Sequence, residues 1–207
     1  MILSLPARCY LLAGAGGRGR IHDRRRVAMV VRAAVLTELL LHGRIADHDG
    51  EVSVTGRGAT GDLLLDDVLA GLAEDGARSW RSLVRRDGPD TLKSLELQLA
   101  AAGLLRRRPT RFLGRPVLEV ADPAVAHHER VRAEAALRTP LSDVDERDAA
   151  VAALAAVAAL GLSRREARSH SRRLAELGER AGPAVPALRH LVRGLRLARA
   201  WAVNPGG

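Results

Sequence analysis

The sequence predicts an all-α fold: a compact helical domain from which one small β-hairpin protrudes. Hydrophobic residues make up 47% of the 207 residues, enough for a core, but aromatic residues make up only 2%. Such a core is built from Leu, Ala and Val, which favours close-packed helices over a β-sandwich. Between glycine and proline breaks, apolar residues also recur mostly at helical spacing. We expect one domain over residues 1–207.

The first elements are a short helix at 6–12 and a long helix at 27–41. The second segment, VAMVVRAAVLTELLL, is apolar on nearly every side, which is typical of a helix at the centre of a domain. Arg32, Thr37 and Glu38 are the exceptions, and the charge of Arg32 must reach solvent, a carboxylate or an anionic ligand. The next segment, 44–55, alternates around Asp49-Gly50 and predicts a small β-hairpin.

An acidic stretch, ATGDLLLDDVLAGL at 59–72, is either a catalytic or metal site or the start of a helix. Thr60 or Asp62 is a suitable N-cap, and the two later aspartates fall in the first turns, where the helix dipole favours carboxylates. A metal site would need a second acidic cluster, and the only other candidate, DVDERD, also looks like a helix start. We therefore interpret the stretch as structural and expect neither metal nor cofactor.

Two further helices are expected at 79–86 and 91–102, followed by an arginine-rich hairpin. In the hairpin, the apolar stretches Phe112-Leu113 and Val117–Val120 flank Gly114. A helix followed by a basic hairpin is also the outline of a winged helix, so nucleic-acid binding is an alternative function. The scarcity of Asn, Gln and aromatic residues speaks against base recognition.

The second half of the chain predicts helices only, at 124–138, 143–162, 163–181 and 187–203. Ser163 and Glu166 fit a capping box. The longest apolar run, AAVAALAAVAALGL, is too short to span a membrane.

The net charge indicates the class of partner, and the cysteine content bears on the cellular compartment. The net charge of +9 makes an anionic partner plausible, whether nucleic acid, a phospholipid surface or an acidic protein. The single cysteine, Cys9, cannot form an internal disulfide and is compatible with a reducing cytosol. No nucleophile elbow is present, so the residues do not indicate a hydrolase, and we expect a protein without catalytic activity. Without a spanning segment or a signal-peptide pattern, we expect it to be cytoplasmic.

Several segments occur together in a recognisable order. They are LTELLLHGRI (36–45), TGDLLLDDVL (60–69), Trp80, LAAAGLLRRR with its hairpin, and VADP (120–123). Over roughly residues 3–162, the chain resembles the Golgi phosphoprotein 3 family, whose bacterial members are common in actinobacteria. The resemblance implies a non-enzymatic protein that binds phosphatidylinositol 4-phosphate peripherally at membranes, holds the tails of membrane proteins, and self-associates through its hairpin.

In relatives, the headgroup pocket combines a tryptophan and an arginine near the first long helix with two later arginines. The first arginine falls on Arg32. The tryptophan falls near Asp23, and the later arginines fall near Pro89 and Leu92, so one pocket residue of four is present. Arginine can also bind phosphate without a complete pocket, because its N–H groups suit bidentate contacts.

These considerations give two sets of candidate site residues. The expected headgroup-binding residues are Arg32, Arg24, Arg25 and Arg26. The expected membrane-contacting or oligomer-forming hairpin residues are Phe112, Leu113, Arg111 and Arg115. Solvated or ion-paired arginines are the alternative, as is a scaffold that binds proteins only. We expect anionic phospholipid headgroups as the main ligand, on the inner face of the plasma membrane.

Overall fold

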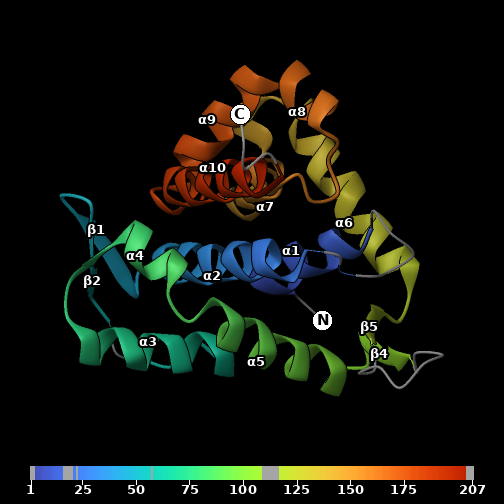
Figure 1. The fold of residues 1–207 in the computed structure, drawn as a ribbon. Coiled ribbons are helices and arrows are strands. Elements are labelled where there is room, and N and C mark those ends of the chain that lie inside the picture. Colours follow the sequence, from blue (N-terminus) through green and yellow to red (C-terminus); the bar gives the residue numbers. More distant parts are fainter. Residues whose placement is uncertain (1–2, 16–20, 22, 57, 109–116, 204–207) are drawn as a thin grey trace.

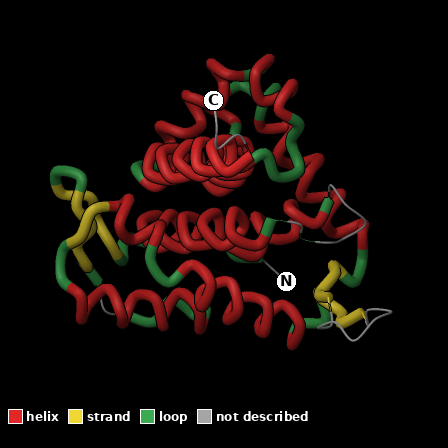
Figure 2. Tube along the Cα trace, in the orientation of Figure 1, coloured by secondary structure: helices red, strands yellow, loops and turns green. Residues whose placement is uncertain are grey.

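The computed structural model describes residues 3–203 except 16–20, 22, 57 and 109–116. The helices are α1 (Leu5–Gly14), α2 (Arg24–Leu41), α3 (Leu63–Asp75), α4 (Trp80–Arg85), α5 (Gly88–Ala101), α6 (Pro123–Ala136), α7 (Glu146–Ala158), α8 (Arg164–Ser169), α9 (Ser171–Ala181) and α10 (Ala184–Val203). The strands are β1 (Ile45–His48), β2 (Glu51–Val54), β3 (Arg78–Ser79), β4 (Leu105–Arg108) and β5 (Val117–Val120). The predicted α-helical class is confirmed, and the strands form two small groups at opposite sides of the view (Figure 2).

Helix α2 is the centre of the molecule. Every residue from Val27 to Leu39 is buried, and α1, α4, α5, α7 and α10 all pack against the helix. In Figure 1 it lies between α7 and α10 above and α3 and α5 below. The helix predicted at 27–41 is confirmed, but it begins at Arg24. The earlier start follows from Asp23, whose carboxylate accepts a hydrogen bond from the Arg26 amide at 3.2 Å.

The predicted hairpin after α2 is confirmed. Strands β1 and β2 are antiparallel with His48 opposite Glu51. Between these two residues, Asp49 and Gly50 have positive φ values of 52° and 85°, as a tight hairpin turn requires. Strand β3 adds to β2 and was not expected from the sequence, because two residues carry no readable pattern.

The second hairpin differs from its prediction. Val117–Val120 pairs with Leu105–Arg108, and not with the apolar stretch Phe112-Leu113. Strand β4 reads Leu-Arg-Arg-Arg, and only its leucine is buried, so it lacks the apolar alternation that identifies a strand. Phe112, Leu113 and the flanking arginines lie outside the described residues.

Helix α7 is shorter than the predicted 143–162. It begins after Asp145, whose carboxylate accepts from the Arg147 amide at 2.9 Å, and it ends where Ala159 and Gly161 take positive φ values. A Cβ atom at Gly161 would lie 2.4 Å from Cδ1 of Leu12, so glycine allows α1 to approach the end of α7. No helix in the described part of the chain is long and apolar enough to cross a membrane.

The helix predicted at 163–181 is divided. Helix α8 ends at Ser169 and α9 starts at Ser171, with His170 between them. The capping box at the start of α8 is confirmed, because Glu166 and Ser163 each accept from the other's backbone amide, at 2.8 Å and 3.2 Å. The last helix starts at Ala184, three residues before its predicted start, with Pro186 in its first turn, where a missing N–H costs nothing.

Candidate functional site

The first expected headgroup residue, Arg24, is engaged with a carboxylate. Its two terminal nitrogens donate to Glu96 at 2.6 Å and 2.8 Å, and Glu96 also accepts from the Tyr10 hydroxyl at 2.9 Å. Because Glu96 is buried, the pair fixes the start of α2 on α5 and α1. The Arg24 side chain nevertheless keeps 56% of its surface exposed. Hydrogen bonding to Glu96 outweighs the opposing effect of burial and raises the pKa of Arg24.

The next two arginines differ from each other. Arg26 turns towards the end of α7, where it donates to the Ala158 carbonyl at 3.2 Å, and it also pairs with Asp23 at 3.2 Å. Arg25 is exposed and has no ion pair among the described residues. Of the three consecutive arginines, Arg25 is therefore the one whose charge is fully available to a ligand.

Arg32 is held by neutral groups. Its Nε donates to the Leu83 carbonyl and one terminal nitrogen donates to the Thr91 hydroxyl, both at 3.2 Å. The side chain is almost completely buried, and the carboxylate of Asp87 lies 3.8 Å from its other terminal nitrogen. Burial lowers the pKa of Arg32, and Asp87 only partly opposes this effect.

Arg32 forms part of the wall of a cavity of about 420 Å³ between α2, α3 and α5, which we call the Arg32 cavity. Its lining carboxylates are Asp67, Glu74, Asp75, Asp87 and Asp90. Apart from Arg32, the only basic residue among the described lining residues is Arg86, and it already pairs with Asp75 at 2.5 Å and Asp87 at 3.2 Å. The Arg32 cavity is therefore negatively charged, which disfavours an anionic ligand.

The acidic stretch before α3 has the structural role that its sequence predicts. Asp62 is the N-cap and accepts from the Leu64 amide at 2.9 Å. Asp66 accepts from both the amide and the hydroxyl of Thr60, at 2.7 Å and 2.8 Å, and these bonds lower the pKa of Asp66. Among the described residues, no group of three or more Asp, Glu, His or Cys side chains is placed to hold a metal ion.

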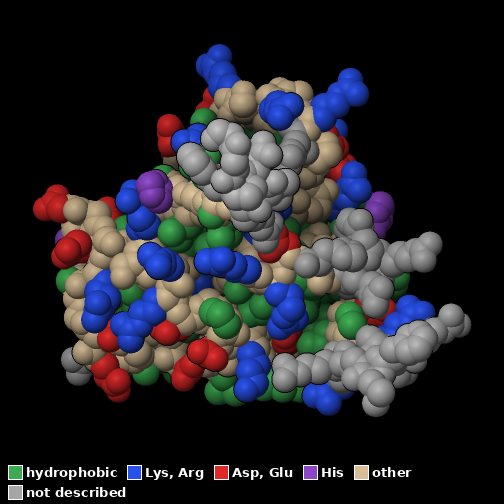
Figure 3. Space-filling model, viewed as in Figure 1, with side chains coloured by type: hydrophobic (Ala, Val, Ile, Leu, Met, Phe, Trp, Pro, Cys, Tyr) green, Lys and Arg blue, Asp and Glu red, His purple; other side chains and the backbone are tan. Residues whose placement is uncertain are grey.

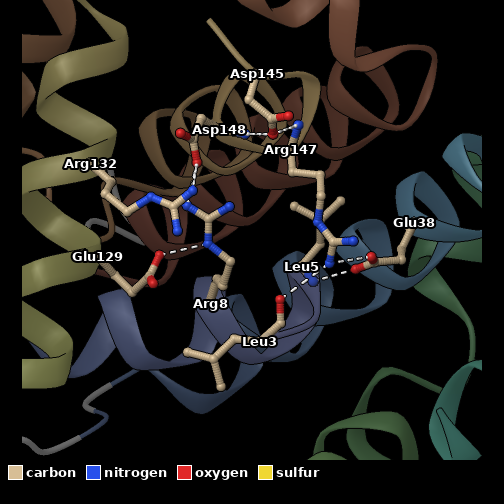
Figure 4. Close-up of polar contacts among 9 residues, drawn as sticks. All are labelled: Leu3, Leu5, Arg8, Glu38, Glu129, Arg132, Asp145, Arg147 and Asp148. Atoms are coloured by element: carbon tan, nitrogen blue, oxygen red, sulfur yellow. Dashed lines mark hydrogen bonds and ion pairs between the residues drawn. The ribbon is translucent and has the colours of Figure 1, made fainter. Parts of the chain in front are cut away.

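A second arginine-lined cavity, which the sequence did not suggest, lies between α1, α6 and α7. It measures about 730 Å³, and we call it the α1–α6–α7 cavity. Arg8 is only 3% exposed there and donates to Glu129 at 2.7 Å and to Asp148 at 2.6 Å. Arg132 of α6 donates to the same oxygen of Asp148 at 2.7 Å (Figure 4). The network ties three helices together.

Arg147 continues the network on the other side of α1. It donates to the Leu3 carbonyl at 3.2 Å and pairs with Glu38 at 2.5 Å (Figure 4). Glu38 is 1% exposed and also accepts from the Leu5 amide at the start of α1, where Ser4 makes no side-chain cap. Burial raises the pKa of Glu38.

Sequence patterns contained two signals for this network, Arg8 and the Glu38 that interrupts the apolar segment 27–41. Arg8 interrupts the apolar segment LPARCYLLAG, and a charge in such a helix needs a partner. Its partners Glu129 and Asp148 are 121 and 140 residues away, so no local spacing could reveal them.

Comparison with known proteins assigns the chain to a family. The family model of Golgi phosphoprotein 3 (GPP34) matches residues 5–195, nearly the whole chain. The chain belongs to the Golgi phosphoprotein 3 family. No curated protein sequence matches it. The resemblance from which the headgroup residues were predicted is thereby confirmed at the level of the family.

Within this family member, the expected headgroup residues do not face one partner. Arg24 faces Glu96, Arg26 faces the end of α7, and Arg32 faces α4 and α5. At the positions of the two later arginines, Pro89 is exposed and Leu92 is buried. Among the four expected headgroup residues, only Arg25 is both exposed and without an ion pair to a described residue, as an arginine available to an anionic ligand would be.

Proposed function

We propose that this member of the Golgi phosphoprotein 3 family is a non-catalytic peripheral adaptor that binds anionic phospholipid headgroups on the cytoplasmic face of a membrane. Family membership and the net charge of +9 support the proposal. Phosphatidylinositol 4-phosphate is the headgroup that the family resemblance suggests. The tails of membrane proteins are the proposed cargo.

The observation that carries the proposal is a set of exposed basic side chains without ion pairs among the described residues. Those on α2, α4 and α5 are Arg25, Arg81, Arg85 and Lys93, which we call the unpaired basic residues; others, such as Arg107, Arg165 and Arg189, lie on other elements. Both α4 and α5 pack against α2. Figure 3 views the molecule from the side on which α4, α5 and α10 lie in front, and basic side chains spread over the middle of this face.

The expected binding energy is sufficient for reversible association. Each basic residue near an anionic leaflet contributes about 1 kcal/mol, so four residues together strengthen binding about a thousandfold. A headgroup at Arg32 would instead have to replace Asp87 and enter the negatively charged Arg32 cavity. We therefore propose Arg25 as the main headgroup contact within α2, with a smaller contribution from Arg32.

Liposome co-sedimentation tests the proposal. Vesicles of phosphatidylcholine alone are compared with vesicles that carry phosphatidylserine or phosphatidylinositol 4-phosphate at equal surface charge. The test variant combines Arg25→Gln, Arg81→Gln and Arg85→Gln. The matched control combines Arg165→Gln, Arg168→Gln and Arg172→Gln, which removes the same charge from α8 and α9 at the far end of the molecule (Figure 1).

Wild type and control should sediment with anionic vesicles, whereas the test variant should lose most of this binding. A preference for phosphatidylinositol 4-phosphate that disappears in Arg32→Gln would extend the proposal to selective headgroup binding. Equal losses of vesicle binding in the test and control variants would show that binding depends on overall charge and not on these residues. Absence of vesicle binding, together with tight binding of duplex DNA, would replace the proposal with the nucleic-acid alternative.

We also propose that the hairpin contributes to membrane contact or to self-association. The residues involved are Phe112, Leu113, Arg111 and Arg115. The variant Phe112→Ser with Leu113→Ser leaves the net charge unchanged, so it separates two roles of the hairpin. Weaker sedimentation at unchanged molecular mass would support a membrane contact. A lower mass in light scattering would support self-association instead.

A further inference from the structure

The α1–α6–α7 cavity combines a suitable size with a buried cation. Its volume of about 730 Å³ lies in the range of small-molecule sites. Arg8, Arg132 and Arg147 enter its lining from α1, α6 and α7, and Leu3 and Val125 add apolar surface. Figure 4 shows Arg8 and Arg132 side by side at Asp148, and Arg147 on the other side of α1, directed towards Glu38.

The three arginines keep donors that the protein does not use. Arg8 bonds through Nε and Nη2, while Arg132 and Arg147 bond through Nη2. No acceptor among the described residues engages Nη1 of any of them. Nη1 of Arg8 is also not among the described side-chain atoms that are buried without a partner, so it reaches solvent. Because Arg8 is 3% exposed and lines the cavity, the cavity is where that nitrogen is accessible.

Among the described residues, the lining of the cavity holds more arginines than carboxylates, and each of these arginines also pairs with a carboxylate. Two carboxylates line it, against three arginines. Glu129 accepts from Arg8, and Asp145 caps the amides at the start of α7, where the helix dipole offsets its charge. Asp148 and Glu38, which also pair with these arginines, are not part of the lining. The Arg32 cavity has the opposite balance.

We propose that the α1–α6–α7 cavity binds a small organic anion through a carboxylate or phosphate group. The anionic oxygens accept hydrogen bonds from the Nη1 groups of Arg8, Arg132 and Arg147, because guanidinium groups suit such oxygens in geometry and charge. The carbon part of the ligand packs against Leu3 and Val125. This site shares no residue with the unpaired basic residues, so it is independent of the proposed membrane contact.

Isothermal titration calorimetry with citrate and with inorganic phosphate, at constant ionic strength, tests the proposal. The wild type should bind at least one probe saturably. Arg132→Gln should weaken binding about tenfold, because it removes a charged donor from a half-exposed position without opening the core. Arg130→Gln is the matched control: it removes the same charge from α6, but Arg130 pairs with Glu134 and does not line the cavity.

Asp145→Asn gives a change in the opposite direction. Asparagine keeps the cap of α7 and removes a negative charge from the cavity lining, so anion binding should become several-fold tighter. Binding that is absent, or that is equal in wild type, Arg132→Gln and Asp145→Asn, would overturn the proposal.

Vesicles that contain phosphatidic acid identify the source of the anionic group. Sedimentation that weakens in Arg132→Gln but not in Arg130→Gln would assign a lipid phosphate to the cavity. Sedimentation independent of Arg132, with citrate binding intact, would assign a dissolved ligand. The variant Arg25→Gln, Arg81→Gln, Arg85→Gln should keep its citrate affinity, so failure of the membrane proposal is distinguishable from failure of this one.

Discussion

Arg8 and Arg32 have nearly the same burial and opposite surroundings. Their exposed fractions are 3% and 5%. Arg8 donates to the carboxylates of Glu129 and Asp148, whereas Arg32 donates to a carbonyl and a hydroxyl and has its nearest carboxylate 3.8 Å away. Burial acts to lower both pKa values, but the carboxylate partners reverse the effect for Arg8, so its pKa is raised while that of Arg32 is lowered.

The difference shows that a buried arginine does not by itself mark an anion-binding site. Next to Arg32, five carboxylates line the cavity, and the charge balance repels anions. Next to Arg8, the carboxylates are engaged by guanidinium groups that still have free donors. The two arginines therefore differ in the acceptors around them and hardly in exposure.

The largest expected effect comes from Arg8→Met. The substitution leaves Glu129, whose side chain is 4% exposed, as a buried charge without its partner. Breaking one side of a buried ion pair lowers the free energy of unfolding by about 3–5 kcal/mol. Urea denaturation followed by circular dichroism measures the change.

A double variant is the control for that measurement. Arg8→Met combined with Glu129→Gln removes the stranded charge and should recover a substantial part of the lost stability. No recovery would show that the cost of Arg8→Met comes from packing and not from charge.

Arg32→Met should have a smaller effect. It removes two hydrogen bonds to neutral acceptors, and Asp87 stays hydrated because its side chain is 48% exposed. The expected loss is about 1–3 kcal/mol by the same denaturation measurement. A loss equal to that of Arg8→Met would contradict the distinction drawn between the two arginines.

The smallest effect is the pH dependence contributed by Glu38. Burial raises its folded-state pKa above the ordinary value of 4.5. Between pH 4.5 and the folded-state pKa, Glu38 is protonated more in the folded protein than in the unfolded chain. Its contribution to the free energy of unfolding is therefore fully present below pH 4.5 and is lost as the pH rises through the folded-state pKa. Glu38→Gln should remove this dependence.

Denaturation midpoints of wild type and Glu38→Gln across the acidic range measure that effect. As the pH rises, the denaturation midpoint of Glu38→Gln should increase relative to that of the wild type. A shift in the opposite direction would mean that the Arg147 ion pair outweighs burial and that Glu38 resembles the carboxylates of the Arg8 network.

Features that depend on near neighbours were predictable from the sequence. The cap at Asp62, the capping box of Ser163 and Glu166, and the Asp49-Gly50 turn each form within six residues. Element ends were less predictable where distant segments set them. Helix α7 ends early, and Leu12 of α1 occupies the space that a side chain at position 161 would need. The partner of β5 was misassigned because arginines fill β4.

The sequence by itself determined the helical class, the central position of the 27–41 segment, the basic charge and the family, because these rest on composition, periodicity and motif order. Only the tertiary structure decided what each arginine binds. Arg24 and Glu96 are 72 residues apart, and Arg8 and Asp148 are 140 apart. Such pairs follow the packing of whole helices, because the burial of apolar faces fixes helix positions and the charges then pair with whatever carboxylate lies within reach.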